Sequence, residues 1–158
     1  MVVKVGLISD THGLLRPQAL EALRGCDYLI HGGDIGKPQI LDALSEIAPL
    51  TVVRGNNDTD DTWAADVPFE AVLHVGSLGI YVTHILADVP ETLPPDIGVV
   101  VTGHSHKPLQ QTRHGVLFIN PGSAGPRRFK LPITIGVLHI DGRDVRGELV
   151  ELQLISHV

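Results

Sequence analysis

Aspartate, asparagine and histidine residues stand where short apolar runs of this chain end, and together they could bind metal ions. Asp10 and His12 follow the run VVKVGLIS, and Asp34 follows YLIHGG. The same residue types follow the runs TVVRG, GIYVT and IGVVVTG, at Asn56, His84, His104 and His106. Imidazole and carboxylate groups suit borderline divalent ions such as Mn²⁺, Zn²⁺ or Fe, and no thiolate accompanies them. These side chains therefore predict one site for two metal ions.

The apolar runs are typical of buried strands. Each run is short, rich in Val and Ile, and followed by Gly, Asp, Asn or His, as expected where a strand enters a loop. In open α/β sheets, ligands bind just beyond the carboxyl ends of the strands, so groups far apart in sequence would converge there. Gly-Asp and Gly-Asn are common turns, and a single histidine at a strand end is usually structural. It is the repetition of the pattern that predicts the site.

The first third of the chain alternates strand and helix. Strands are predicted over 2–8, 27–31 and 50–54, and helices over 17–24 and 38–47. A proline, well suited to a first helical turn, begins each helix. This alternation is the signature of a parallel sheet with right-handed crossovers.

From Glu70 onward the pattern changes to strands with short connections. The predicted strands cover 70–75, 78–83, 97–102, 115–119, 133–140 and 144–155. Gly76-Ser77 and Asp141-Gly142 indicate hairpin turns, and three prolines allow at most a short helix between His84 and the strand at 97. We expect two packed sheets with helices outside, in a single domain over 1–158.

Composition limits the class of protein. The 158 residues are 43% hydrophobic and carry 12 Lys and Arg against 18 Asp and Glu, a formal charge of −6, which argues against a large nucleic-acid footprint. Cys26 is the one cysteine, so no intramolecular disulfide can form. There is no secretory signal pattern and no run near the ~20 apolar residues of a membrane span. We expect a cytoplasmic protein that does not contact membranes.

Five motifs occur in an order that resembles the calcineurin-like metallophosphoesterase superfamily. They are Asp10-Thr11-His12, Gly33-Asp34, Gly55-Asn56-Asn57-Asp58, Thr83-His84 and Gly103-His104-Ser105-His106. The small size and the turn Asn120-Pro121-Gly122-Ser123 resemble its YfcE-type phosphodiesterase branch, which also contains the retromer scaffold subunit. The resemblance runs from the first strand to about Arg128. It implies a four-layer α/β sandwich, with two mixed β-sheets flanked by helices, around two metal ions.

The resemblance also implies a role for each ligand. The first ion would be bound by Asp10, His12, Asp34 and His106. The second would be bound by Asp34, Asn56, His84 and His104. Asp34 would bridge the two ions and, with Asn56 and His84, would form the catalytic group. Mn²⁺ is our first expectation, with Zn²⁺, Fe, Ni²⁺ and Mg²⁺ as alternatives.

The expected activity is hydrolysis of a small phosphodiester by in-line attack of a hydroxide that bridges the two metal ions. A phosphomonoesterase or nucleotidase is the alternative within enzymes. A non-catalytic scaffold, like the retromer subunit, is the alternative outside them. The expected partner is a small phosphate ester, and the pattern leaves a homo-oligomer open.

Several other polar residues carry weaker predictions. Many superfamily phosphatases have a histidine directly after the asparagine ligand, but this chain has Asn57, which cannot protonate a leaving group. His31 could orient a ligand or be structural, and Arg127 with Arg128 could bind phosphate or be an exposed basic pair. We expect the turn that begins at Asn120 to support the site. The remaining histidines are expected to be structural or exposed: His74, His114, His139 and His157.

Overall fold

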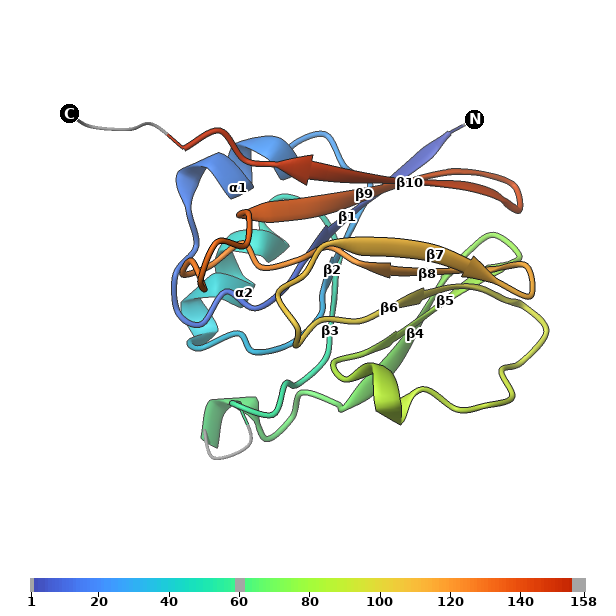
Figure 1. Cartoon of the computed structure of the whole chain (residues 1–158), viewed down its shortest axis with the longest axis horizontal. Helices are drawn as coiled ribbons and strands as arrows, with labels where there is room; N and C mark the ends of the chain where they lie inside the picture. Colours follow the sequence, from blue (N-terminus) through green and yellow to red (C-terminus); the bar gives the residue numbers. More distant parts are fainter. Residues whose placement is uncertain (1, 59–61, 155–158) are drawn as a thin grey trace.

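The computed structural model describes residues 2–58 and 62–154 and arranges their strands in two five-stranded sheets (Figure 1). The first sheet has the order β10-β9-β1-β2-β3. Its strands are β1 (Val3–Ile8), β2 (Tyr28–His31), β3 (Leu50–Val52), β9 (Thr134–Asp141) and β10 (Asp144–Glu151). Strands β1, β2 and β3 are parallel, so their carboxyl ends share one edge, and β9 and β10 form an antiparallel hairpin beside β1.

The second sheet has the order β4-β5-β6-β8-β7. Its strands are β4 (Glu70–Val75), β5 (Leu78–Thr83), β6 (Ile97–Val101), β7 (Leu109–Arg113) and β8 (Val116–Asn120). The three central strands are parallel, and the outer two are antiparallel to their neighbours. Both sheets therefore have a parallel centre, which is the arrangement that gathers strand ends at one edge.

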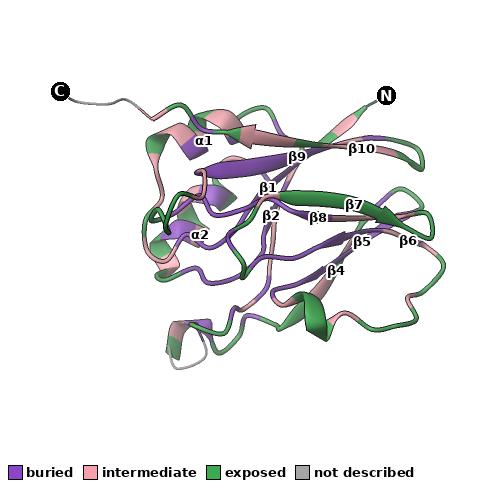
Figure 2. Ribbon diagram, viewed as in Figure 1, coloured by how far each residue is buried: buried purple, intermediate pink, exposed green. Residues whose placement is uncertain are grey.

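The main core lies between the two sheets. In β1, Val5 and Leu7 point into this core with 0% exposure, opposite Ile80 and Val82 of β5. Figure 2 shows the buried central strands of both sheets. Gly6 faces the other side of β1, where an added Cβ would lie 2.6 Å from Leu23. Burial of aliphatic side chains on both faces of β1 therefore fixes the position of the loop that follows it.

The two α-helices, α1 (Pro17–Leu23) and α2 (Pro38–Ser45), cover the outer face of the first sheet. The outer face of the second sheet is covered by the segment 85–96, which contains the 3-10 turn η2 (Leu86–Asp88). A second 3-10 turn, η1 (Thr62–Ala64), follows β3.

The α/β class with two mixed sheets is confirmed. No helix in the described ranges is long and apolar enough to cross a membrane.

Most predicted elements end within two residues of the observed ones, and both hairpin turns are confirmed, with Gly76 and Gly142 at positive φ. One strand was missed. Strand β7 is exposed at every position and lies at a sheet edge, so it shows no apolar alternation. The last strand, predicted over 144–155, is wrong at its end, because pairing with β9 stops at Glu151 and Leu152 packs into the core under the helices. Residue 155 lies outside the described residues.

Candidate metal centre

The predicted ligands lie at the carboxyl ends of five parallel strands: β1, β2 and β3 of the first sheet, and β5 and β6 of the second. Five of them have a left-handed backbone, at φ 54° (Asp10), 45° (His12), 56° (Asp34), 74° (His104) and 64° (His106). Residues other than glycine rarely adopt this conformation, which costs on the order of 1–3 kcal/mol each. Such strain concentrated at one edge is typical of a functional site.

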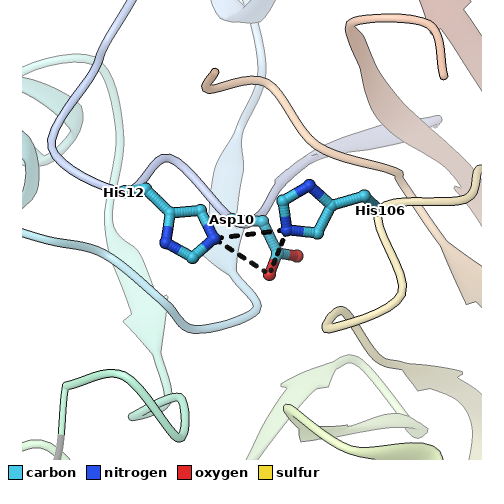
Figure 3. A group of neighbouring side chains, drawn as sticks. All are labelled: Asp10, His12 and His106. Atoms are coloured by element: carbon cyan, nitrogen blue, oxygen red, sulfur yellow. Dashed lines mark hydrogen bonds and ion pairs between the residues drawn. The ribbon is translucent and has the colours of Figure 1, made fainter. Parts of the chain in front are cut away.

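The first cluster joins the loop after β1 to the loop after β6. Figure 3 shows Asp10, His12 and His106 pointing toward one another. His106 Nε2 lies 3.2 Å from His12 Nε2 and 3.5 Å from Asp10 Oδ1. Two imidazoles and a carboxylate thus converge on one point from residues 94 positions apart.

The second cluster contains Asp34, His84 and His104. Asp34 Oδ2 lies 3.2 Å from His84 Nε2, and His104 Nδ1 lies 3.1 Å from Asn56 Oδ1. The same Asp34 oxygen is 3.7 Å from His12 Nε2, so this carboxylate lies between the two clusters. All seven predicted ligands are therefore brought together.

Asp10 Oδ1 and His84 Nε2 lie 3.8 Å apart, and neither has a hydrogen-bond partner among residues 2–58 and 62–154. Asp10 is fully buried, and its Oδ2 accepts hydrogen bonds from the Ser9 hydroxyl (2.7 Å) and the His104 N–H (3.1 Å), which leaves Oδ1 without one. His84 Nδ1 donates to the Gly32 carbonyl (2.7 Å), so the lone pair of a neutral ring is on Nε2, which is also unpartnered. Unsatisfied buried polar atoms are costly, and a divalent cation fits this donor set.

The pKa shifts agree with a site that favours positive charge. Burial raises the pKa of Asp10, although the nearby His84 opposes the shift. Burial would lower the pKa of His84, but its contacts with Asp34 and Asp10 raise it. For Asp34, burial is outweighed by the contact with His84 and the hydrogen bond from Asn57, which lower the pKa to about 2. Asp34 is therefore an anion at neutral pH, and both carboxylates favour a cation between them.

The pKa of His106 shifts in the opposite direction to that of His84. Burial, followed by the electrostatic effects of Arg128 and of the neighbouring His12, lowers the pKa of His106 to about 4. Its imidazole is therefore neutral at pH 7, which is the form that binds metal.

Asn57 and Asp58 hold the loops that carry Asp34 and Asn56. Asn57 donates to Asp34 twice, from its backbone N to Oδ1 (2.9 Å) and from Nδ2 to Oδ2 (3.1 Å). Asp58 is fully buried and accepts hydrogen bonds from the backbone N–H groups of Ile35 (3.0 Å), Gly36 (3.2 Å) and Gly55 (3.0 Å). The sequence showed Asp58 beside a ligand, but its role as a clamp between two loops was missed.

Replacing Asp58 by Asn is expected to loosen both loops, because an amide NH₂ group would face backbone donors that now bind a carboxylate. An unsatisfied buried group costs about 1–3 kcal/mol, and loss of a group that supports ligands weakens metal binding roughly 10- to 100-fold. Urea unfolding of the metal-free protein and Mn²⁺ titration measure the two effects. Asp66→Asn, at an exposed position of the following segment, is the control that should change neither. Equal values for both variants would contradict the clamp.

The turn that begins at Asn120 supports two ligand loops, as predicted. Asn120 Nδ2 donates to the Gly103 carbonyl (2.9 Å), and the Ser123 hydroxyl donates to the Asp10 carbonyl (2.9 Å). At Gly125 an added Cβ would lie 2.3 Å from the Thr11 carbonyl oxygen, so the backbone of the turn lies directly against the β1 loop. None of these contacts involves a ligand side chain, which agrees with a supporting role.

His31 connects the loops that flank the ligands. The Gly33 N–H donates to His31 Nδ1 (3.0 Å), so the ring proton is on Nε2 and is donated to the Thr11 hydroxyl (3.0 Å). That hydroxyl donates in turn to the Ile35 carbonyl (2.8 Å). His31 is fully buried, and burial lowers its pKa to about 3. Its role in this network is structural and requires a neutral ring.

This buried ring predicts a specific sensitivity to acid. Between the ordinary histidine pKa of 6.5 and the folded value of about 3, the unfolded chain binds a proton that the folded chain does not. The free energy of unfolding should therefore fall by about 1.4 kcal/mol per pH unit from this group as the pH drops through that window. His31→Asn should show a correspondingly shallower decline in urea unfolding of the metal-free protein between pH 7 and 4. His114→Asn, at an exposed position in the turn between β7 and β8, should keep the native slope, and equal slopes for all three proteins would contradict the assignment.

The remaining candidates lie outside the two clusters. Arg127 and Arg128 are exposed, and Arg127 donates to the Leu131 carbonyl (3.3 Å). His74 pairs with Asp96 at 2.7 Å and His139 with Glu148 at 2.9 Å. His114 is exposed in the turn between β7 and β8. His157 lies outside the described residues.

Known proteins are similar to this chain in sequence and in architecture. The family profile of the calcineurin-like phosphoesterase superfamily domain matches residues 3–143. A probable metallophosphoesterase of Methanothermobacter thermautotrophicus is 30% identical over 159 residues, which cover 92% of this chain and 91% of that protein. The phosphodiesterase YfcE of Escherichia coli is 27% identical over 165 residues and 89% of each chain.

Solved structures agree with the fold. A predicted phosphoesterase from Streptococcus pneumoniae superimposes with a TM-score of 0.71 at 25% identity, over 96% of this chain and 90% of that one. The zinc complex of Vps29 from Entamoeba histolytica superimposes with a TM-score of 0.69 at 24% identity, over 94% and 100% of the two chains. With a profile match over most of its length, the chain belongs to the calcineurin-like phosphoesterase superfamily.

Proposed function

We propose that the protein is a metal-dependent phosphodiesterase that hydrolyses a small phosphodiester, with residues 1–158 forming a single metallophosphoesterase domain. The observation that supports this most directly is the pair of ligand clusters, Asp10 with His12 and His106, and Asp34 with His84 and His104. Within each cluster the ligand atoms lie within 4.8 Å of one another. The names of the relatives, metallophosphoesterase and phosphodiesterase, support the same activity.

The proposed ligands divide between two ions. Asp10, His12, Asp34 and His106 would hold the first, and Asp34, Asn56, His84 and His104 the second. Bound there, two divalent ions neutralise phosphate charge and activate water for in-line attack. The chain itself keeps Asp34 ionised through its contact with His84 and the hydrogen bonds from Asn57, and it keeps the lone pair of a neutral His84 on Nε2 through the Gly32 carbonyl. In this way the protein fixes the ligand atoms before an ion arrives.

Four imidazoles, two carboxylates and one amide suit Mn²⁺, which we propose as the ion used. The alternatives to Mn²⁺ are Zn²⁺, Fe, Ni²⁺ and Mg²⁺, and one activity assay compares all five ions. A cytoplasmic location remains a prediction from the sequence, whose single cysteine permits a reducing compartment. The decisive experiment loads the metal-free protein with each ion and measures hydrolysis of cyclic nucleotides, dinucleotides, nucleotides, and aryl phosphate monoesters and diesters. Hydrolysis of diesters with Mn²⁺ is expected, and no turnover with any ion would contradict the proposal.

The alternative outside enzymes is a non-catalytic interaction module, and the relatives that bear on it are the structures of Vps29, vacuolar protein sorting 29. Its structures share this fold at identities of 20–24%. In this chain both clusters are complete and their unpartnered atoms face one another, which favours catalysis. A phosphomonoesterase is the alternative within enzymes, and the monoesters in the assay distinguish it.

Asn57 predicts how rate depends on the leaving group. Its side chain cannot protonate a departing oxygen and already donates to Asp34. Rates should therefore fall steeply from aryl to alkyl phosphodiesters, because general acid help, typically ~10²–10⁴-fold, is missing. Asn57→His should flatten this dependence by adding an acid beside the leaving oxygen.

The matched control is Asn57→Ala, which removes the same hydrogen bond to Asp34 without adding an acid. It should lower all rates while keeping the native slope. The measurement is a series of diesters that differ only in leaving-group pKa, at saturating Mn²⁺. A shallow slope in the native protein would show that another group supplies the proton.

A further inference from the structure

We propose that Arg54 is a substrate-binding residue that holds the anionic oxygens of the phosphate ester in a small pocket beside the second metal cluster. This inference rests on the proposed function and adds a residue outside the predicted ligand set. Arg54 follows β3 and lies two positions before Asn56. It lines a cavity of about 200 Å³ together with Asn56, His84 and Phe69. A cationic side chain thus shares one cavity with two proposed metal ligands.

The guanidinium of Arg54 is held by an aromatic platform. Its central carbon lies 4.1 Å from the centre of the Phe69 ring. Phe69 is 56% exposed, and its position is set by the β4–β5 register, which pairs Glu70 with Thr83 and so brings Phe69 beside His84. The Thr83 hydroxyl also donates to the Phe69 carbonyl (3.3 Å). A half-exposed phenylalanine at this point is explained if it fixes the plane of the guanidinium.

Within the described residues, the Arg54 guanidinium has no hydrogen-bond acceptor. Arg54 Nε is buried and has no hydrogen-bond partner, and no ion pair or side-chain hydrogen bond of Arg54 occurs among residues 2–58 and 62–154. Even Asp88, a carboxylate that lines the same cavity, is not paired with it. Arginine has five N–H donors in a fixed fork, and a buried Nε without an acceptor is unfavourable, while the terminal nitrogens of Arg54 make no hydrogen bond within the described residues. A ligand in the cavity would provide the acceptors.

An anionic phosphate ester has the hydrogen-bond acceptors that the Arg54 guanidinium lacks within the described residues. The chain carries a net charge of −6, and Asp10 and Asp34 lie at the centre, so an anionic ester needs positive groups nearby. The planar fork of arginine binds two phosphate oxygens at once, which a lysine ammonium cannot do in the same geometry. Arg54 would therefore bind non-bridging oxygens of the ester and orient it relative to Asn56 and His84.

The test compares Arg54→Gln and Arg54→Lys with the native protein after loading with Mn²⁺. Calorimetry measures the dissociation constant of inorganic phosphate, and steady-state kinetics gives KM and kcat for an aryl phosphodiester. Hydrogen bonds to charged groups predict that Arg54→Gln weakens phosphate binding and raises KM roughly 10- to 100-fold. Arg54→Lys should recover part of the loss. Both variants should bind the native number of Mn²⁺ equivalents, because Arg54 is not a ligand.

Two further variants sharpen the result. Phe69→Leu keeps the charge but removes the platform, so it should weaken phosphate binding less than Arg54→Gln does. Arg24→Gln, which removes an exposed partner of Glu21, should leave phosphate binding unchanged. The backbone N of Arg54 donates to the Pro68 carbonyl (2.7 Å), and side-chain replacement keeps this bond.

Native phosphate affinity in an Arg54→Gln variant that binds two Mn²⁺ would overturn the inference. If Arg54→Gln does not fold, native affinity in Arg54→Lys would overturn it instead. Phosphate binding requires no turnover. A native protein without esterase activity would therefore contradict the proposed function, whereas equal phosphate affinities would contradict the role of Arg54.

Discussion

Replacing Asp34 by Asn is expected to remove one of two bound Mn²⁺ equivalents and to lower turnover of an aryl phosphodiester by about 10³-fold or more. Asp34 Oδ2 lies 3.2 Å from His84 Nε2 and 3.7 Å from His12 Nε2, so one carboxylate serves both clusters. Loss of its charge should weaken both ion sites, and several kcal/mol of electrostatic stabilisation corresponds to a rate loss of this size. Metal analysis of the purified protein and kcat on the same sample measure the effect.

The control for this variant is Asp42→Asn, at an exposed position of α2, which should bind metal and turn over normally. The Asp34 variant should also lose more activity than any variant of a ligand in a single cluster. Two bound Mn²⁺ equivalents with normal hydrolysis in Asp34→Asn would show that the assigned site is wrong.

The positions of the ligands could be predicted because each one lies in the loop that follows a strand of mostly apolar sequence. Val5 and Leu7 are fully buried in β1, which ends at Ile8. The position of this strand therefore fixes the position of Asp10, which lies two residues beyond its end. The same reasoning applies to Asp34 after β2 and His84 after β5. Parallel strands place their carboxyl ends at one edge, so knowledge of the strands was enough to bring the ligands together.

Strand β7 could not be predicted, for a physical reason. All five of its residues, Leu109–Arg113, are exposed, so the side chains carry no period of two. Its backbone pairing with β8 is what makes it a strand, and that pairing is not visible in a single segment. The outer layer of the second sheet is similar, since Val89 and Leu93 pack there from a loop with only a 3-10 turn.

The roles of Asp58 and Arg54 also depend on contacts across the fold. Asp58 acts through backbone N–H groups of Ile35 and Gly36, whose directions follow from the loop conformation and not from residue type. Arg54 stands out because its buried Nε has no hydrogen-bond partner among the described residues, which only the three-dimensional environment reveals. Sequence patterns therefore identified the proposed metal ligands, but not the groups that position them or the arginine that we propose binds the ester.

His104→Ala and His106→Ala are each expected to remove one Mn²⁺ equivalent and most of the turnover while the protein stays folded. The two histidines belong to different clusters, and the apolar core lies behind them between the sheets. His106 is 3% exposed, but within the described residues its Nδ1 has no hydrogen-bond partner and its Nε2 contacts only His12 at hydrogen-bond distance, so its replacement breaks few hydrogen bonds. Circular dichroism, metal analysis and kcat on the same samples test this. Global unfolding of both alanine variants would favour a structural role.

Glycine at positions 104 and 106 should distinguish the cost of the left-handed backbone from the loss of a metal ligand. His104 and His106 have φ of 74° and 64°, a conformation that glycine adopts without the steric cost of a Cβ, whereas alanine retains that cost. In the metal-free state, His106→Gly should therefore be more stable than His106→Ala by about 1 kcal/mol, although both lose the same metal equivalent. At Leu41 of α2, where the backbone is helical, the order of Gly and Ala should reverse. Urea unfolding of the four variants gives the comparison. If alanine is the more stable residue at position 106 as well, the left-handed backbone does not store the strain that we assign to it, and the stability of the metal-free loop must have another origin.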